Sequence, residues 1–278
     1  MDPERSPQLP PLAEEWGETE AALLDAFAVP SYLALFVAEA EGALLVGEAA
    51  RVVHLGCRTG YPDALWLEKM PKTSGVGVDA SPALLAVASS HLGSLTMRYV
   101  VASPEESGLD GQSFSHAFSF HPLGGPEARL RLFQEMSRLL YSGGQALLAL
   151  PSGQSFQELV DLLSEYALKH GRTDLDAAVD ALEHQRPTPQ QLQEELQSAG
   201  LSDVGIEMKS QTLTFSSGLA FMEDPAVKLL ILPQIESWLG GMKLETEVLD
   251  YWIRAIDKYW SDSEFELSFE IATVSARR

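Results

Sequence analysis

The chain has 278 residues, of which 45% are hydrophobic and 21% charged, and its formal net charge is −21. That length and apolar fraction suit one large α/β domain, or one domain with an elaboration, and exclude a chain that is disordered throughout. So acidic a surface repels phosphate backbones and anionic lipid, which excludes nucleic acid and membrane surfaces as expected partners and leaves a small molecule or a basic protein.

Cys57 is the single cysteine, so the chain can form no internal disulfide, and a reducing, cytoplasmic location is expected. The N-terminus lacks the basic and apolar regions of a signal peptide. No run of about 18 apolar residues occurs, so no membrane span is expected. The sequence leaves the oligomeric state open.

The N-terminal part is predicted to be a tail followed by two helices. Residues 1–18 are rich in Pro and Glu and predict a flexible tail. Helices are predicted over 19–28 and 31–47, with Pro30 separating them.

From residue 51 onward, short apolar strands alternate with helices. Strands are predicted over 51–55, 75–79, 96–101, 114–120, 145–150, 203–209 and 265–274. Helices are predicted over 62–70, 82–91, 126–141, 154–169, 174–183 and 189–199. Three local signals support these boundaries: the N-cap Ser81, a glycine stop at 142–144, and a capping box formed by Thr188 and Gln191.

This alternation predicts a doubly wound, Rossmann-like α/β fold with a seven-stranded, mostly parallel sheet. The last strand is expected to be antiparallel. Residues 19–210 and 263–278 would form the α/β domain, and 211–262 would form a helical insert or lid.

One turn points to a cofactor site. The apolar run 51–55 ends in a turn with glycine at its first and fifth positions, Gly56 and Gly60. About twenty residues later a second strand ends in Asp79. A glycine turn exposes backbone N–H groups at the carboxyl edge of a parallel sheet, and a carboxylate on the next strand can accept both hydroxyls of a ribose. This spacing is typical of a nucleotide-type cofactor site.

With its neighbouring segments, this turn resembles the class I S-adenosylmethionine-dependent methyltransferases over roughly residues 50–210. The family's first motif, D/E-x-G-x-G-x-G, corresponds to 54–60, and its acidic second motif to Asp79. Residues 101–106 correspond to the third motif, 138–144 to R-x-L-K-P-G-G, and 188–200 to the helix before the sixth strand. The resemblance implies S-adenosylmethionine as cofactor and methyl transfer to a small molecule.

Carried over position by position, the resemblance assigns roles to several residues. Gly56 and Gly60 would shape the turn beneath the methionine part of the cofactor, and Asp79 would hold the ribose. Phe120 and His121 end the fourth strand near the reactive methyl, and His121 is the candidate general base. The cofactor-binding residues implied in this way are His54, Gly56, Cys57, Arg58, Gly60, Asp79, Ala80, Ser103, Pro104 and Phe120.

Four positions depart from the family pattern. His54 stands where the family has an acidic residue, Arg58 replaces the middle glycine, and Ser103 and Ser115 replace aspartates. Loss of one charge-assisted contact at His54 would weaken cofactor binding by roughly 1.5–3 kcal/mol. The Arg58 side chain could turn to solvent or fill the pocket.

Two functions therefore stay open: an active methyltransferase on a small molecule, and a catalytically inactive scaffold or module that binds a basic protein. Several residues have simpler structural interpretations, Cys57 as a packing residue and His54 as a locally bonded strand end. His116 and His121 lie five apart on one strand and face opposite ways, so no metal site is expected.

Overall fold

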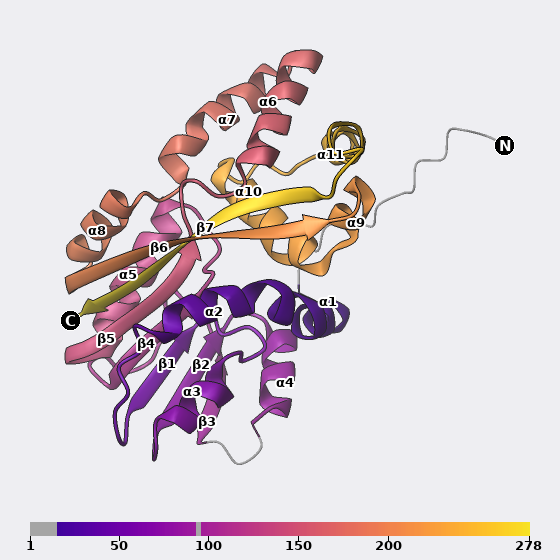
Figure 1. Ribbon diagram of the computed structural model, residues 1–278. Helices are drawn as coiled ribbons and strands as arrows, with labels where there is room; N and C mark the ends of the chain where they lie inside the picture. The colour runs from indigo at the N-terminus through magenta and orange to yellow at the C-terminus, as the bar shows by residue number, and fades with distance from the viewer. Residues whose placement is uncertain (1–15, 93–95) are drawn as a thin grey trace.

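The computed structural model describes residues 16–92 and 96–278. The chain forms one seven-stranded sheet in the order β3-β2-β1-β4-β5-β7-β6, with helices packed against both of its faces (Figure 1). This confirms the predicted Rossmann-like, doubly wound α/β fold. Most of the predicted tail over 1–18 lies outside the described residues.

Five strands of the sheet run parallel, and the last strand runs antiparallel to both of its neighbours, as predicted. The parallel strands are β1 (Arg51–Leu55), β2 (Ser74–Asp79), β3 (Met97–Val101), β4 (Phe114–Phe120) and β5 (Leu140–Pro151). Strand β7 (Phe265–Arg277) lies between β5 and β6 (Ser202–Phe215). The strand order reverses between β1 and β4, and in such sheets ligands bind beyond the carboxyl ends of the strands at this point.

Each face of the sheet has its own hydrophobic core. On one face, α3 (Asp63–Lys69), α4 (Pro82–Ser90) and the N-terminal helix pack over side chains such as Val52 and Phe118. On the other, α5 (Pro126–Leu139) and α8 (Pro189–Ser198) cover alternate side chains of the same strands. Side chains alternate between the faces because successive strand residues point in opposite directions.

The N-terminal helix is continuous, so the predicted break at Pro30 is wrong. Segments α1 (Glu18–Leu23), η1 (Leu24–Leu33) and α2 (Ala34–Glu41) follow one another without interruption, and Pro30 lies inside the π-helical stretch η1. Wider turns of this kind relieve the clash between a proline ring and the preceding turn. The helix ends at Glu41, six residues before the predicted end at 47.

By length and composition alone, the helix Glu18–Glu41 could cross a membrane, with a mean hydropathy of 1.8. A core helix passes the same test, and 44% of its most apolar window is buried inside the protein. Tyr32 and Phe36, both fully buried, pack against the sheet through Phe269. The helix therefore contributes to the core.

A helical unit extends from one end of the sheet, where β6 and β7 run on as a long two-stranded ribbon (Figure 1). Because β6 continues to Phe215, the helices begin at residue 218, later than the predicted start at 211. They are α9 (Gly218–Glu223), η2 (Val227–Ile231), α10 (Leu232–Trp238) and α11 (Thr246–Tyr259), with α6 (Gln157–His170) and α7 (Thr173–Gln185) beside them.

The predicted local signals are confirmed at two helix starts and corrected at one helix end. The Ser81 hydroxyl accepts the backbone N–H of Leu84 at 3.3 Å, and Thr188 and Gln191 form the capping box. Helix α5 ends already at Leu139, and Gly143, with φ of 81°, lies inside β5 rather than at the helix end.

Candidate active site

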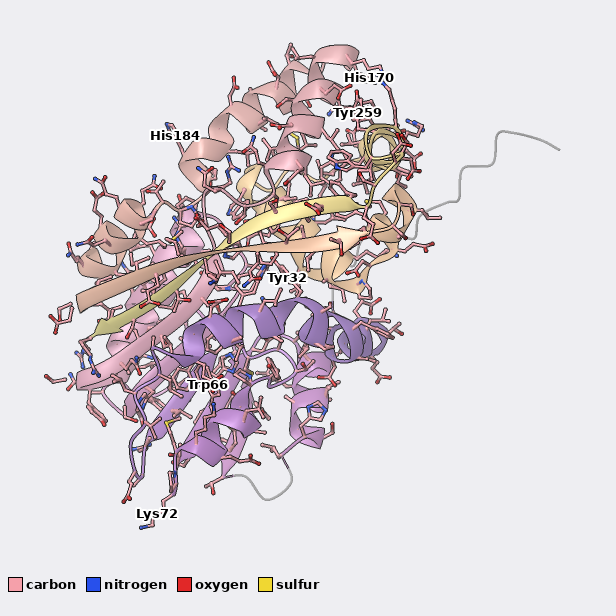
Figure 2. All side chains as sticks on the ribbon, viewed as in Figure 1. Tyr32, Trp66, Lys72, His170, His184 and Tyr259 are labelled. Carbon is pink, nitrogen blue, oxygen red and sulfur yellow. The ribbon has the colours of Figure 1, made fainter. Side chains whose placement is uncertain are left out.

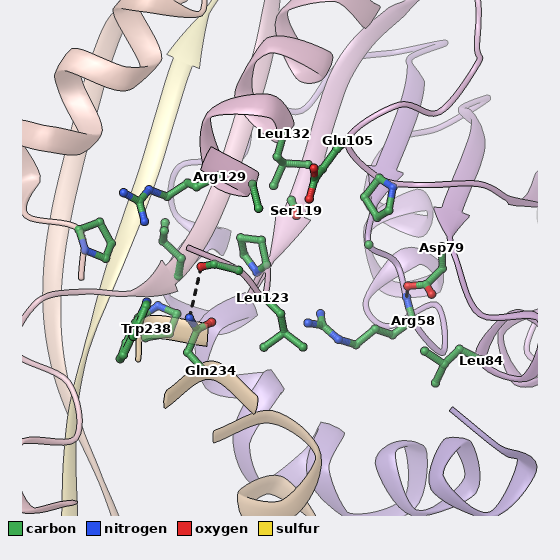
Figure 3. Close-up of a pocket in the computed structure, with 18 of the residues that line it drawn as sticks. Arg58, Asp79, Leu84, Glu105, Ser119, Leu123, Arg129, Leu132, Gln234 and Trp238 are labelled. Carbon is green, nitrogen blue, oxygen red and sulfur yellow. Dashed lines mark hydrogen bonds between the residues drawn. The ribbon is translucent and has the colours of Figure 1, made fainter. Parts of the chain in front are cut away.

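A cleft of about 200 Å³ opens at the carboxyl ends of β1, β2, β4 and β5, where the strand order reverses. Four of the residues predicted to bind cofactor line it: Gly56, Arg58, Asp79 and Pro104. The same cleft continues to Gln234 and Trp238 on α10 (Figure 3). The sheet edge and the helical unit thus form opposite ends of a single cavity.

The glycine turn has the conformation that its sequence predicts. Gly56 and Gly60 have φ of 69° and 81°, values that side chains other than glycine rarely adopt. The backbone N–H groups of Gly56 and Cys57 donate to Val78 O at 2.8 and 3.1 Å, which joins the turn to β2.

Asp79 holds the turn and the next helix together. Its Oδ2 accepts the backbone N–H of Arg58 at 3.0 Å, and its Oδ1 accepts that of Ser81 at 3.0 Å. The side chain is buried but lines the cleft. Each carboxylate oxygen has a second lone pair, so both can still receive a ligand hydroxyl.

The Arg58 side chain does not turn to solvent but crosses the end of β4. Its Nη1 donates to Phe120 O at 2.8 Å and its Nη2 to His121 O at 2.6 Å. Arg58 has φ of 48° and is only 9% exposed. Burial lowers the pKa of its guanidinium, and the charge of Asp79 opposes this shift. The cation therefore lies against the two residues that the resemblance places near the reactive methyl.

A buried network takes the place of the acidic residue of the first motif. His54 Nδ1 lies 2.7 Å from Asp63 Oδ1, and Tyr99 Oη donates to Asp63 Oδ2 at 3.0 Å. Burial and the nearby Asp63 carboxylate raise the pKa of Tyr99. Both oxygens of Asp63 are thus engaged, and neither points to a ligand. Asp63 did not emerge from the sequence, although a carboxylate at the start of the helix after the glycine turn is a local signal for it.

Between this network and the N-terminal helix, almost no space is left. The cavity there has a volume of about 10 Å³, enough for one water at most. Val29, Leu33 and Val37 close it from the helix, opposite His54 and Arg58. An extended polar arm such as that of methionine has no room in this cavity.

His121, the candidate general base, faces the core rather than the cleft. It is fully buried, has φ of 50°, and packs edge-on against Phe36. Its Nε2 lies 3.0 Å from Tyr32 Oη, while Nδ1 has no hydrogen-bond partner within 16–92 and 96–278. Burial, followed by the charge of Arg58, lowers its pKa well below the usual range.

Three further predicted positions stand apart from the cleft. Ala80 and Ser103 are exposed, and the Ser103 hydroxyl accepts the backbone N–H of Glu105 at 3.2 Å. Cys57 is buried, and burial raises the pKa of its thiol. No group of three His, Cys, Asp or Glu side chains suited to a metal ion occurs in the described part of the chain.

Several lining residues of the cleft did not emerge from the sequence. Arg129, buried on α5, pairs with Glu195 through two hydrogen bonds of 2.7 Å each. The Gln234 side-chain amide lies 3.5 Å from Gly124 O (Figure 3). Trp16 and Trp238 add aromatic walls. These residues come from four distant segments, so no local pattern joins them.

Comparisons with known proteins agree with this architecture. Residues 52–144 match the family described as methyltransferase domain. No curated protein matches the chain.

Among solved structures, the chain is similar to a phosphoethanolamine N-methyltransferase 2 of Haemonchus contortus in complex with phosphomonomethylethanolamine and S-adenosylhomocysteine. The two are 16% identical with a TM-score of 0.55, and the match covers 95% of this chain and 59% of that one. A chain from the complex containing the Trm112 methyltransferase activator of Haloferax volcanii is 17% identical with a TM-score of 0.56, over 95% and 98% of the two chains. A geranyl diphosphate C-methyltransferase of Streptomyces coelicolor is 14% identical with a TM-score of 0.51, over 96% and 86%.

The fit of S-adenosylmethionine to the site differs between its two ends. The adenosine end has a carboxylate at Asp79, a glycine turn and apolar walls at Leu84 and Pro104. The methionine end meets the Arg58 guanidinium and a cavity of about 10 Å³. In this conformation the residues fit the nucleoside but not the sulfonium and its amino-acid arm.

Proposed function

Because residues 52–144 carry a methyltransferase domain and the chain has the fold of the class I S-adenosylmethionine-dependent methyltransferases, we propose that it is a member that binds a small ligand without transferring a methyl group. One observation carries this proposal. The Arg58 guanidinium donates to the carbonyls of Phe120 and His121, the two residues that the resemblance places near the cofactor's reactive methyl.

Electrostatics oppose the two cations occupying one site. At about 4 Å, two like charges repel by about 4 kcal/mol at the effective dielectric typical of proteins, equivalent to roughly 1,000-fold in affinity. The family's compensating carboxylate is also missing, since His54 replaces it and Asp63 is engaged by His54 and Tyr99. For the cofactor to bind in full, Arg58 must give up two hydrogen bonds and leave its buried position.

A second candidate, an S-adenosylmethionine-dependent methyltransferase of a small molecule, is favoured by a different observation. Asp79 and Trp238 line one continuous cleft, as expected where a nucleoside cofactor and its substrate meet. Methyl transfer depends mainly on alignment and exclusion of water and needs no dedicated base, so a buried His121 does not count against it.

Calorimetry separates the two candidates. Wild-type protein and Arg58→Gly are titrated with S-adenosylmethionine and S-adenosylhomocysteine up to millimolar concentration. Glycine suits the positive φ of 48° at this position, so the variant should fold. We expect no binding to the wild type and measurable binding to Arg58→Gly. Arg98→Ala, at an exposed arginine on β3, serves as control and should behave as wild type.

Two outcomes would contradict the proposal. Micromolar binding of S-adenosylmethionine to the wild type would favour the enzyme. A folded Arg58→Gly variant that still binds neither compound would show that Arg58 is not what excludes them.

A further inference from the structure

We propose that the cleft binds a small organic acid, with its carboxylate paired to Arg58 and a planar apolar body lying toward Leu123 and Trp238. This inference rests on the proposed function, because it requires Arg58 to stay where the structure places it. The juxtaposition that carries it is a buried guanidinium, with no carboxylate of residues 16–92 and 96–278 within 4.0 Å, at the wall of a cleft lined largely by apolar side chains.

The charge of Arg58 is not neutralised by direct contact. A guanidinium has five N–H donors, and two of these donate to the uncharged carbonyls of Phe120 and His121. No carboxylate of the described residues lies within 4.0 Å of it. The oxygens of Asp79, which also lines the cleft, accept the backbone N–H groups of Arg58 and Ser81, so its charge acts on the guanidinium only through space. A buried charge without a partner is costly, and a ligand carboxylate would remove that cost.

A second buried arginine that lines the same cleft does have a carboxylate partner. Arg129 faces Glu195 in a two-fold contact, with both nitrogen–oxygen distances at 2.7 Å. Glu105, which also lines the cleft, pairs with Arg131 at 2.5 Å. These charges therefore cancel in pairs, and Arg58 is left as a positive point inside a chain whose net charge is −21.

The direction of the Arg58 side chain places its guanidinium at the inner wall of the cleft. Arg58 runs away from Asp79, with its guanidinium toward Leu123 and the side of Gln234 (Figure 3). A planar carboxylate can meet such a fork with two parallel hydrogen bonds, which selects it over a neutral group of equal shape.

Apolar side chains form much of the rest of the lining, beside the paired Arg129 and the Gln234 amide. Pro122, Leu123, Leu132 and Leu150 line the cleft together with the Trp238 ring. An apolar cavity of about 150 Å³ is known to hold one benzene ring, and this cleft has about 200 Å³. A single ring bearing a short acid arm therefore matches both its volume and its polarity.

The test uses an acid, the amide of equal shape, and an amine of similar size. Phenylacetate, phenylacetamide and phenethylamine are titrated into the full-length protein by calorimetry at 0.15 M salt, about the physiological ionic strength. We expect phenylacetate to bind about 10- to 150-fold more tightly than the amide, the range given by charge-assisted hydrogen bonds. Phenethylamine should bind most weakly, because its ammonium faces the guanidinium.

Variants assign any preference to Arg58. Arg58→Gln keeps a polar side chain without charge and should lose the preference for the acid, whereas Arg58→Lys should keep part of it. Arg98→Gln removes one exposed positive charge elsewhere and should keep the wild-type preference. The melting temperature of each variant, measured without ligand, shows that it is folded.

Three results would overturn the inference: equal affinity for acid and amide, no binding of any probe, or a preference for the acid that survives Arg58→Gln. Inorganic phosphate binding as tightly as phenylacetate would overturn the assignment of an apolar body. None of these results depends on S-adenosylmethionine, whose separate titration decides the proposed function.

Discussion

Asp63 Oδ1 lies 2.7 Å from His54 Nδ1, and both side chains are buried. The acidic group expected at the start of the glycine turn thus stands nine residues later, at the beginning of α3, and faces a histidine. Tyr99 completes the contact by donating to the second oxygen at 3.0 Å. The network fixes β1, α3 and β3 to one another instead of presenting a carboxylate to a ligand.

Removing Asp63 should therefore damage stability. Asp63→Ala leaves the buried His54 and the half-buried Tyr99 without their acceptor, and we expect the free energy of unfolding to fall by about 1–3 kcal/mol. Urea denaturation followed by circular dichroism measures the loss. Asp262→Ala, at an exposed aspartate, should change it by less than about 0.5 kcal/mol. A loss below about 1 kcal/mol at Asp63 would contradict a structural role for the pair.

Local sequence signals predicted the frame of the site because local backbone geometry demands them. Gly56 and Gly60 adopt positive φ, and Asp79 and Ser81 fix a strand end and a helix start. The doubly wound, mostly parallel sheet was predicted from strand–helix alternation and the handedness of crossovers, whereas the strand order β3-β2-β1-β4-β5-β7-β6 comes from the structure.

Side-chain direction could not be predicted in the same way. Whether Arg58 would reach solvent or the pocket depends on carbonyls 62 and 63 residues away along the chain. The part of the cleft beside Trp238 could not be predicted either, because α10 meets the sheet edge only in the folded molecule. The helix break predicted at Pro30 was wrong because the tertiary packing of Tyr32 and Phe36 stabilises a continuous helix despite the proline.

A comparison of alanine substitutions at two glycines with the same φ separates the cost of backbone strain from the cost of a steric overlap. Gly60 and Gly143 both have φ of 81°, so alanine at either position costs about 1–2 kcal/mol in backbone strain. A Cβ at Gly60 would also overlap Tyr99 Oη, whereas a Cβ at Gly143 would meet nothing within 4 Å. We expect Gly60→Ala to lose a further 1–3 kcal/mol, roughly, relative to Gly143→Ala in urea denaturation. Equal losses would show that Tyr99 moves aside freely.

Stability should fall between pH 7.5 and 5.5 because His121 is buried in its neutral form. Its pKa in the folded protein lies well below 6.5, owing first to burial and then to Arg58. As the pH falls through about 6.5, the unfolded chain binds a proton at this residue that the native protein does not bind. The free energy of unfolding should therefore drop by about 1 kcal/mol from His121 alone by pH 5.5.

Replacing His121 tests that assignment. His121→Asn removes the titrating ring with a residue that tolerates the positive φ of 50°, so its stability should depend less on pH by that amount. His116 retains its own contribution of the same sign, since burial lowers its pKa as well. His184→Asn, at an exposed position on α7, should leave the wild-type dependence unchanged. An unchanged pH dependence in His121→Asn would contradict the prediction.

The role of Asp79 can be isolated once Arg58 is removed. In the Arg58→Gly background, the Asp79 carboxylate still lines the cleft and has acceptor capacity beyond its contacts to the backbone N–H groups of residue 58 and Ser81. If it receives ribose hydroxyls, Asp79→Asn in that background should weaken S-adenosylhomocysteine binding about 10- to 150-fold, because a charged acceptor is replaced by a neutral one. Calorimetry measures this directly.

Glu105→Gln provides the control in the same background. Glu105 lines the same cleft, but its carboxylate is directed to Arg131 at 2.5 Å, so the loss of its charge should leave the affinity within about two-fold. Equal effects at Asp79 and Glu105 would mean that the ligand senses only the overall negative charge of the cleft. A specific effect at Asp79 would mean that its carboxylate accepts hydrogen bonds from the nucleoside, as the resemblance implies.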